Sequence, residues 1–139
     1  MRALPKPLDA YPFVTEHDLR FADMDMLGHV NNSAYGSFME TSRTSLFSGC
    51  TVPGHISIAL VRFEIDYLKE MRWPGRALAP SGVEHVGGSS FRLRQAVFAD
   101  GVARAEAVST LCLLNLETRR AAPIDEALRA ELARWMMRG

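Results

Sequence analysis

The chain has 139 residues with 16 basic and 16 acidic side chains, and therefore a formal net charge of zero. This balance argues against nucleic acid or an anionic membrane as the main partner, and the length argues for one domain. A domain of this size can fold without a disulfide or a structural metal, and its two cysteines have no metal-binding spacing.

Residues 1–12 are predicted to form an extended N-terminal arm, because Pro5, Pro7 and Pro12 prevent regular backbone hydrogen bonding. The arm lacks the apolar core of a signal peptide, and no segment of the sequence has the length of a membrane span. We therefore expect a cytoplasmic protein with no membrane partner. Residues 13–139 are expected to form a single domain.

A strand, a turn and a helix are predicted next. Residues 14–21 are typical of a strand, and residues 23–32 follow as a turn rich in acids and amides. Apolar or small side chains then recur with helical spacing up to about Phe47. Asn31, Asn32 or Ser33 can cap this helix. The free N–H groups at its start carry partial positive charge and suit an anion or a developing oxyanion.

Four strands are predicted over residues 55–69, 76–86, 90–99 and 102–116. Gly87-Gly88 and Asp100-Gly101 predict hairpins between the last three. In the first strand, alternation predicts one apolar face, made of Ala59, Val61, Phe63, Ile65 and Tyr67.

Small side chains on the last of these strands predict a surface on which the long helix packs closely. They are Ala103, Ala105, Ala107 and Ser109, and Gly36 and Ser37 are expected to help from the helix side. Residues 123–137 are predicted to form a final helix with an apolar stripe made of Leu128, Leu132, Trp135 and Met136.

The turn carries a family resemblance. Its pattern, Asp-x-Asp-x-x-Gly-His-Val-Asn-Asn over residues 23–32, resembles the 4-hydroxybenzoyl-CoA thioesterase group of hotdog-fold proteins. The His-Val-Asn-Asn part is also similar to the acyl-carrier-protein thioesterases of the same superfamily. The resemblance continues through Tyr35, Glu40 and Arg43, and more weakly through residues 65–67 and 87–91.

This resemblance implies an α+β hotdog fold. Its antiparallel sheet of about five strands would wrap round a long central helix, with a C-terminal helix added. It also implies a homodimer with active sites between the subunits, commonly assembled as a dimer of dimers. The sequence itself favours a dimer, because a five-stranded sheet covered by one helix leaves its edges open.

The implied function is an acyl-CoA thioesterase that releases a free acid and coenzyme A. Coenzyme A is part of the substrate, and neither a cofactor nor a metal is expected. Asp25 matches the catalytic carboxylate of the family, and thioester hydrolysis needs such a base or nucleophile near oxyanion donors. The structural alternative is that Asp25 braces the turn, while Asp23 is expected to be structural.

Two further residues of the turn are assigned to the site by resemblance. His29 matches the histidine that acts with the acid in acyl-carrier-protein thioesterases, and its structural alternative is a turn histidine bonded to the backbone. Asn32 is expected to face the pocket and to orient water or substrate. Glu40 is the alternative carboxylate, since another branch of the superfamily uses a helix glutamate; its structural alternative is a surface ion pair with Arg43.

Substrate-binding residues are expected at two other places. A backbone N–H near Ser57 and Ile58 would complete an oxyanion hole in the partner subunit. Ser89, Ser90 and Arg92 would contact coenzyme A phosphates or pantetheine, although Arg92 also fits a solvated strand face. Two alternative functions remain: hydrolysis of acyl groups from acyl carrier protein, and binding of acyl thioesters without turnover.

Overall fold

A computed structural model describes residues 4–139 of the chain. The predicted arm over residues 1–12 begins outside the described residues, and Leu8–Ala10 within it forms a short 3-10 turn. The strands are β1 (Phe13–Asp18), β2 (Ile56–Tyr67), β3 (Arg76–Val86), β4 (Ser90–Ala99), β5 (Val102–Asn115) and β6 (Arg120–Ala121), and the helices are α1 (Asn32–Phe47) and α2 (Glu126–Ala133).

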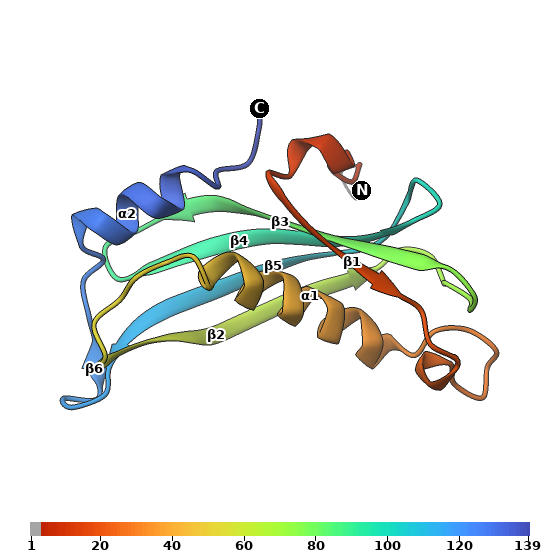
Figure 1. Cartoon of the computed structure of the whole chain (residues 1–139), viewed down its shortest axis with the longest axis horizontal. Helices are drawn as coiled ribbons and strands as arrows, with labels where there is room; N and C mark the ends of the chain where they lie inside the picture. Colours follow the sequence, from red (N-terminus) through yellow and green to blue (C-terminus); the bar gives the residue numbers. More distant parts are fainter. Residues whose placement is uncertain (1–3) are drawn as a thin grey trace.

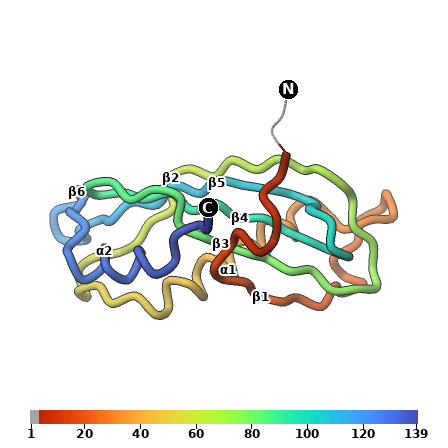
Figure 2. The backbone as a smooth tube through the Cα atoms, turned by 90° about the horizontal axis from the view of Figure 1, so that it is seen from above, coloured from red at the N-terminus to blue at the C-terminus, as the bar shows by residue number. Residues whose placement is uncertain are grey.

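The strands form one antiparallel sheet in the order β1-β3-β4-β5-β2, with β6 paired to β5. β1 and β2 flank α1 in the sequence but lie at opposite edges of the sheet, so α1 crosses one face of it (Figure 1). The predicted α+β architecture, a curled antiparallel sheet round a central helix, is therefore confirmed, but the helix is shorter than a long central helix, with 16 residues. The turn before α1 and helix α2 lie at opposite ends of the molecule in both views (Figures 1 and 2).

Small side chains form the surface of the sheet on which α1 packs. Ala105, Ala107 and Ser109 are buried there, as predicted, together with alanines of β3. The prediction for Ala103 is wrong, because the β4–β5 register shifts and leaves Arg104 as an extra residue. This bulge turns Ala103 to the outer face, where it packs with a separate apolar cluster.

The predicted apolar face of β2 is partly wrong, because this strand also contains a bulge. Phe63 and Ile65 pack toward α1 as predicted, but the pairing with β5 leaves Val61 as an extra residue. The alternation therefore reverses before this point, and Ile58 points inward where Ala59 was predicted to do so. Val61 itself is 62% exposed at the sheet edge.

Buried hydrogen bonds hold α1 to the sheet. The Gln95 amide donates to Ser81 Oγ at 2.8 Å, and Gln95 Oε1 accepts from Ser109 at 2.7 Å and from Arg43 at 3.3 Å. Ser42 Oγ lies 2.7 Å from Ser81 Oγ. Burial lowers the pKa of Arg43. Since buried polar groups are costly when unpaired, this network fixes the position of the helix.

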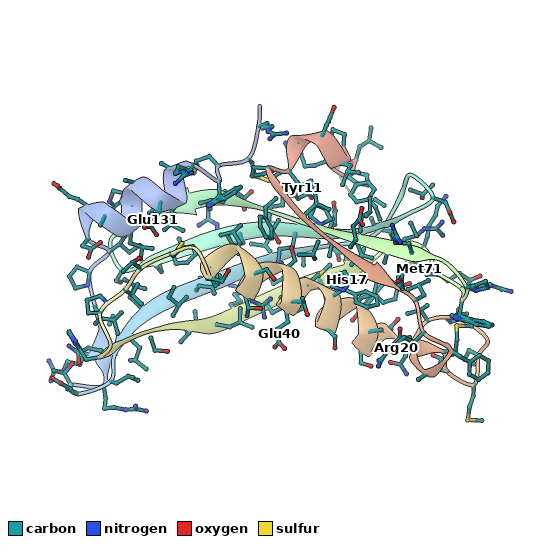
Figure 3. The ribbon with its side chains drawn as sticks, in the orientation of Figure 1. Tyr11, His17, Arg20, Glu40, Met71 and Glu131 are labelled. Carbon is teal, nitrogen blue, oxygen red and sulfur yellow. The ribbon has the colours of Figure 1, made fainter. Side chains whose placement is uncertain are left out.

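The predicted pair of Glu40 and Arg43 is present, with 3.9 Å between Arg43 Nη2 and Glu40 Oε2, but only its carboxylate end is at the surface: the Glu40 side chain is 71% exposed and that of Arg43 is 7% exposed. Glu40 points away from the sheet (Figure 3). Gly36 and Ser37 do not form the close contact with the sheet: Ser37 is exposed, and Gly36 has open space where a side chain would begin.

The predicted ends of two other elements are also corrected. β1 ends at Asp18, and residues 21–23 form a 3-10 turn that helps to shape the site. α2 keeps Leu128 and Leu132 buried but ends at Ala133, so Trp135 and Met136 are not helical. The tail instead pairs with β3 just beyond the point where β1 begins, and there it satisfies backbone groups of Val83 that would otherwise be unpaired.

Candidate active site

The turn before α1 is closed by its own backbone. The Asp25 N–H donates to the His29 carbonyl at 3.0 Å, and the Gly28 N–H donates to the Asp25 carbonyl at 3.2 Å. Gly28 has a φ of 85°, a conformation that strongly favours glycine. These bonds therefore fix the positions of Asp25 and His29 relative to each other.

Asp23 has the structural role that its sequence position indicated. It is 7% exposed, and its carboxylate accepts hydrogen bonds from the Arg20 N–H at 2.9 Å and from the Arg20 guanidinium at 2.8 and 3.2 Å. The hydrogen bonds from Arg20 lower the pKa of Asp23. The Asp23 carbonyl also accepts from the Asn31 N–H at 2.8 Å, which ties this turn to the start of the helix.

Asn31 and Asn32 have different positions at the start of α1. Asn31 is the N-cap, and its Oδ1 accepts from the Ser33 N–H at 2.9 Å. Asn32 is the first residue of α1, so its N–H has no acceptor carbonyl within the helix. The Val30 N–H donates to the Met71 carbonyl at 2.7 Å and fastens this end of the helix to the segment after β2.

A pocket of about 220 Å³ lies beside this helix start. It brings together two of the predicted catalytic residues, His29 and Asn32, with residues from the end of β2 and the segment after it. The other lining residues are Val30, Tyr35, Tyr67, Leu68, Lys69 and Glu70. The pocket thus joins the start of α1 to the end of β2, two parts of the chain that are distant in sequence.

The polar wall of the pocket is a histidine–carboxylate pair. His29 Nε2 lies 3.4 Å from Glu70 Oε2, and the side chains are 26% and 55% exposed. An aromatic wall faces the helix start: the rings of Tyr35 and Tyr67 meet edge to face with centroids 5.4 Å apart. The Tyr35 hydroxyl donates to the Lys69 carbonyl at 3.2 Å, and burial raises the pKa of Tyr35.

Asp25 does not line this pocket. Its half-buried side chain accepts a hydrogen bond from the Leu27 N–H at 2.9 Å, the bracing contact given above as its structural alternative. It nevertheless belongs to the same short turn as His29. A catalytic role for Asp25 stays a prediction.

The remaining predicted residues stand away from the pocket within one chain. Ser57 and Ile58 open β2, whereas the pocket contains Tyr67 at its end, roughly 33 Å along the strand. Ser89 and Ser90 follow the Gly87-Gly88 turn, and Arg92 lies on the outer sheet face, 3.8 Å from Glu84. A single chain therefore does not assemble these residues with His29 and Asn32, and their roles stay predictions.

Glu70 and Tyr67 were not identified from the sequence as site residues. Both precede the Trp73-Pro74-Gly75 turn, where charged residues are typical of solvated loops. Their only sequence signal is the resemblance at residues 65–67, which marks the end of β2. The contact between Glu70 and His29 depends on how the end of β2 packs against the start of α1, and a local sequence pattern does not predict such tertiary packing.

The described residues offer neither a metal site nor a membrane-spanning helix. No group of three or more His, Cys, Asp or Glu side chains within residues 4–139 is arranged to hold a metal ion. Over the same residues, neither helix has the length and apolar character needed to cross a bilayer. Cys50 and Cys112 are both free thiols, and burial raises the pKa of Cys50 to about 11.

Comparison with known proteins gives a consistent result. The family model described as the thioesterase-like superfamily matches residues 19–132. A thioesterase from Thermus thermophilus, solved in complex with coenzyme A and Zn, is 32% identical with a TM-score of 0.79, over 89% of this chain and 93% of that one. A predicted thioesterase from Bacillus stearothermophilus is 25% identical with a TM-score of 0.83, over 91% and 98% of the two chains.

A third solved structure supports the fold alone. It is a 1,4-dihydroxy-2-naphthoyl-CoA thioesterase from Synechocystis, 18% identical with a TM-score of 0.78, covering 87% of this chain and 95% of that one. No match was found among curated protein sequences.

Proposed function

This chain belongs to the thioesterase-like superfamily and is a thioester hydrolase, and we propose that its substrate is the thioester of an acyl group with coenzyme A. The observation that carries the proposal is the pocket at the start of α1, which is lined by the His29–Glu70 pair and by Asn32, the first residue of the helix. The relative from Thermus thermophilus, which was solved with coenzyme A, supports this choice of thiol carrier.

The proposed chemistry places the thioester carbonyl against the Asn32 N–H. This donor and the dipole of α1 would stabilise the negative oxygen that forms when the carbonyl carbon is attacked. Water is the final nucleophile, and the C–S bond breaks to release the free acid and the thiol of coenzyme A. No separate cofactor is needed in this scheme.

Asp25 is proposed to start the reaction, either by taking a proton from water or by attacking the carbonyl carbon directly. In the direct route, the resulting anhydride is hydrolysed by water. In the present arrangement Asp25 Oδ1 accepts from the Leu27 N–H at 2.9 Å and the side chain does not line the pocket, so for either route the carboxylate must turn toward the pocket. His29, oriented by Glu70, and the Asn32 side chain would hold the water in line with the carbonyl.

We also propose that the site is completed by a second copy of the chain, paired through β2. β2 is a long edge strand with exposed Leu60, Val61 and Tyr67, whereas the opposite edge, β1, has only 6 residues. Antiparallel pairing of two β2 strands would bring the start of one, with Ser57 and Ile58, toward the end of the other, near Tyr67. Two such dimers would then form the tetramer.

The same pairing leaves the outer sheet face open to the coenzyme. Ser89, Ser90 and Arg92 are proposed to contact its pantetheine or phosphates from that face. A cytoplasmic location is proposed as well, because both cysteines are free thiols and coenzyme A thioesters would be the substrates.

The test is steady-state hydrolysis of a panel of aromatic, short-chain and long-chain acyl-CoAs with a thiol reporter. We expect saturable release of thiol from at least one of them. The same acyl group on acyl carrier protein should give a lower kcat/KM; a higher value would favour the carrier protein as substrate. Tight binding of intact acyl-CoA without thiol release would show a binding protein instead of an enzyme.

A further inference from the structure

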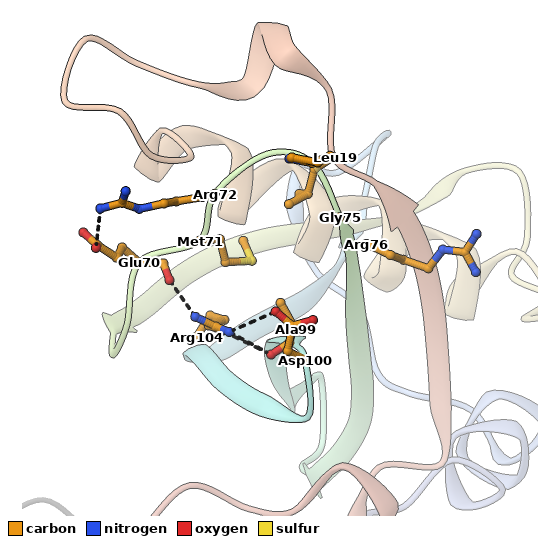
Figure 4. A pocket seen from close by; sticks show the side chains of 10 residues that line it. Leu19, Glu70, Met71, Arg72, Gly75, Arg76, Ala99, Asp100 and Arg104 are labelled. Carbon is orange, nitrogen blue, oxygen red and sulfur yellow. Dashed lines mark hydrogen bonds and ion pairs between the residues drawn. The ribbon is translucent and has the colours of Figure 1, made fainter.

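A second cavity, of about 280 Å³, adjoins the candidate active site and shares Glu70 with it. Its apolar lining comes from Leu19, Met71 and Ala99. Arg72 and Arg104 also line it; in Figure 4 the side chain of Arg72 extends outward to Glu70, and Arg104 lies between Glu70 and Ala99. The proposed reaction uses none of these five side chains.

Arg104 is a fixed cation in this cavity. It is the extra residue of the β5 bulge, and its side chain is only 17% exposed. Its guanidinium donates to the Glu70 carbonyl at 2.7 Å and to the Ala99 carbonyl at 3.0 and 3.2 Å. Its ion-pair partner, Asp100, is 3.5 Å away and 93% exposed, so solvent screens that pair strongly.

The second cation, Arg72, shares its counter-charge with the active site. Glu70 Oε1 lies 3.2 Å from Arg72 while Glu70 Oε2 lies 3.4 Å from His29. Arg76 also lines the cavity, but it points away in Figure 4 and pairs with Glu16 and Asp18 on β1. The positive charge of Arg72 and Arg104 is therefore only partly neutralised.

We propose that this cavity binds a phosphate ester, with its phosphate between Arg72 and Arg104 and its less polar part on Leu19, Met71 and Ala99. Guanidinium groups match the geometry of phosphate oxygens, and the side chain of Arg104 is already held in place by its hydrogen bonds to backbone carbonyls. On binding, the phosphate would replace Glu70 as the ion-pair partner of Arg72. The Glu70 carboxylate would then keep only its contact with His29. Ligand binding would thus strengthen the pair in the neighbouring pocket.

Two sources can supply this phosphate. One is the nucleotide end of the acyl-CoA being hydrolysed, a reading that rests on the proposed function. The other is a separate phosphate compound that regulates the enzyme. In both cases this phosphate site lies beside the candidate active site, and it is separate from the contacts with coenzyme A that are proposed above for Arg92 on the outer sheet face.

Isothermal titration tests the site itself. Coenzyme A, adenosine 3′,5′-bisphosphate and inorganic phosphate are titrated into the wild type and the variants Arg72→Gln, Arg104→Gln and Arg138→Gln. We expect at least one compound to bind, and its affinity to fall about tenfold or more in the first two variants, because each loses a charged hydrogen bond. Arg138, which donates to the Asp9 carbonyl and lines neither cavity, is the matched control, and its variant should bind like wild type.

Arg104→Gln also removes bonds to backbone carbonyls, so its folding is checked by thermal unfolding. Arg72 is 67% exposed, and its variant keeps the test decisive if Arg104→Gln does not fold. The proposal is overturned if none of the three compounds binds, or if a compound binds folded Arg72→Gln as tightly as wild type.

Kinetics then separate the two sources. Acyl-CoA is compared with the same acyl group on pantetheine, which lacks phosphate and nucleotide. If the site holds the substrate's own nucleotide, the ratio of kcat/KM for acyl-CoA to that for acyl-pantetheine falls in Arg72→Gln. If it holds a separate compound, that ratio stays unchanged while the compound loses affinity. Binding without any hydrolysis would overturn the proposed function and leave this site standing.

Discussion

His29 Nε2 and Glu70 Oε2 lie 3.4 Å apart, and this contact joins the turn before α1 to the segment after β2. The backbone supports the same junction, because the Val30 N–H donates to the Met71 carbonyl at 2.7 Å. A carboxylate beside one imidazole nitrogen orients the ring and selects which nitrogen carries the proton. Glu70 is therefore placed to act through His29.

Replacement of Glu70 by Gln tests this relationship. The neutral amide loses the charged contact with His29, so we expect kcat to fall about 10- to 100-fold with a smaller change in KM. Steady-state kinetics on the best acyl-CoA measures both constants. The control is Glu117→Gln, an exposed carboxylate in the loop after β5, which should keep wild-type kinetics. Equal kcat in Glu70→Gln and wild type would remove Glu70 from the mechanism.

Asp25→Asn separates the catalytic role of Asp25 from its structural one. Asparagine keeps a side-chain oxygen that can accept from the Leu27 N–H, so the melting temperature should change little. It lacks a basic carboxylate, so we expect kcat/KM to fall about 100-fold or more. Asp25→Ala should lose both activity and part of the thermal stability. An Asn variant as active as wild type would leave Asp25 with only its bracing role.

The predicted bounds of β3 and β4 agree with the structure because glycine turns mark their ends locally. The bulges at Val61 and Arg104 were not predicted, since a bulge depends on how two strands fit together. In the site, the motif predicted that His29 and Asn32 belong to one pocket, and they do. Glu70 joins the same pocket only through tertiary packing, which the motif does not describe. What the sequence recorded was local geometry, and what it missed were contacts between distant segments.

Acid should weaken the contact between Arg20 and Asp23. Hydrogen bonds from Arg20 lower the pKa of Asp23 in the folded protein, below its ordinary value of 3.8. The contribution of the ionised carboxylate to stability is therefore complete above that ordinary value and is lost as the pH falls through the lowered pKa. We expect the difference in melting temperature between wild type and Asp23→Asn to shrink between about pH 5 and pH 2. A difference that stays constant over this range would contradict the pairing.

The final prediction concerns the edge strand β2, whose exposed middle is apolar. Val61 is 62% exposed at the bulge, and Leu60 beside it is 43% exposed. If two β2 strands pair, a lysine at position 61 places like charges close together across the pair, which is destabilising. We expect Val61→Lys to be a folded monomer by circular dichroism and light scattering, whereas wild type is at least a dimer.

Val14→Lys is the matched control for that experiment, because Val14 is 40% exposed on the opposite edge strand, β1. It should keep the oligomeric state and the activity of wild type. Monomeric Val61→Lys should lose most of its kcat/KM, since the start of β2 in the partner subunit would no longer lie beside the His29 pocket. A monomer with full activity would show that one chain contains the complete site, and a Val61→Lys dimer would show that the chains pair through another surface.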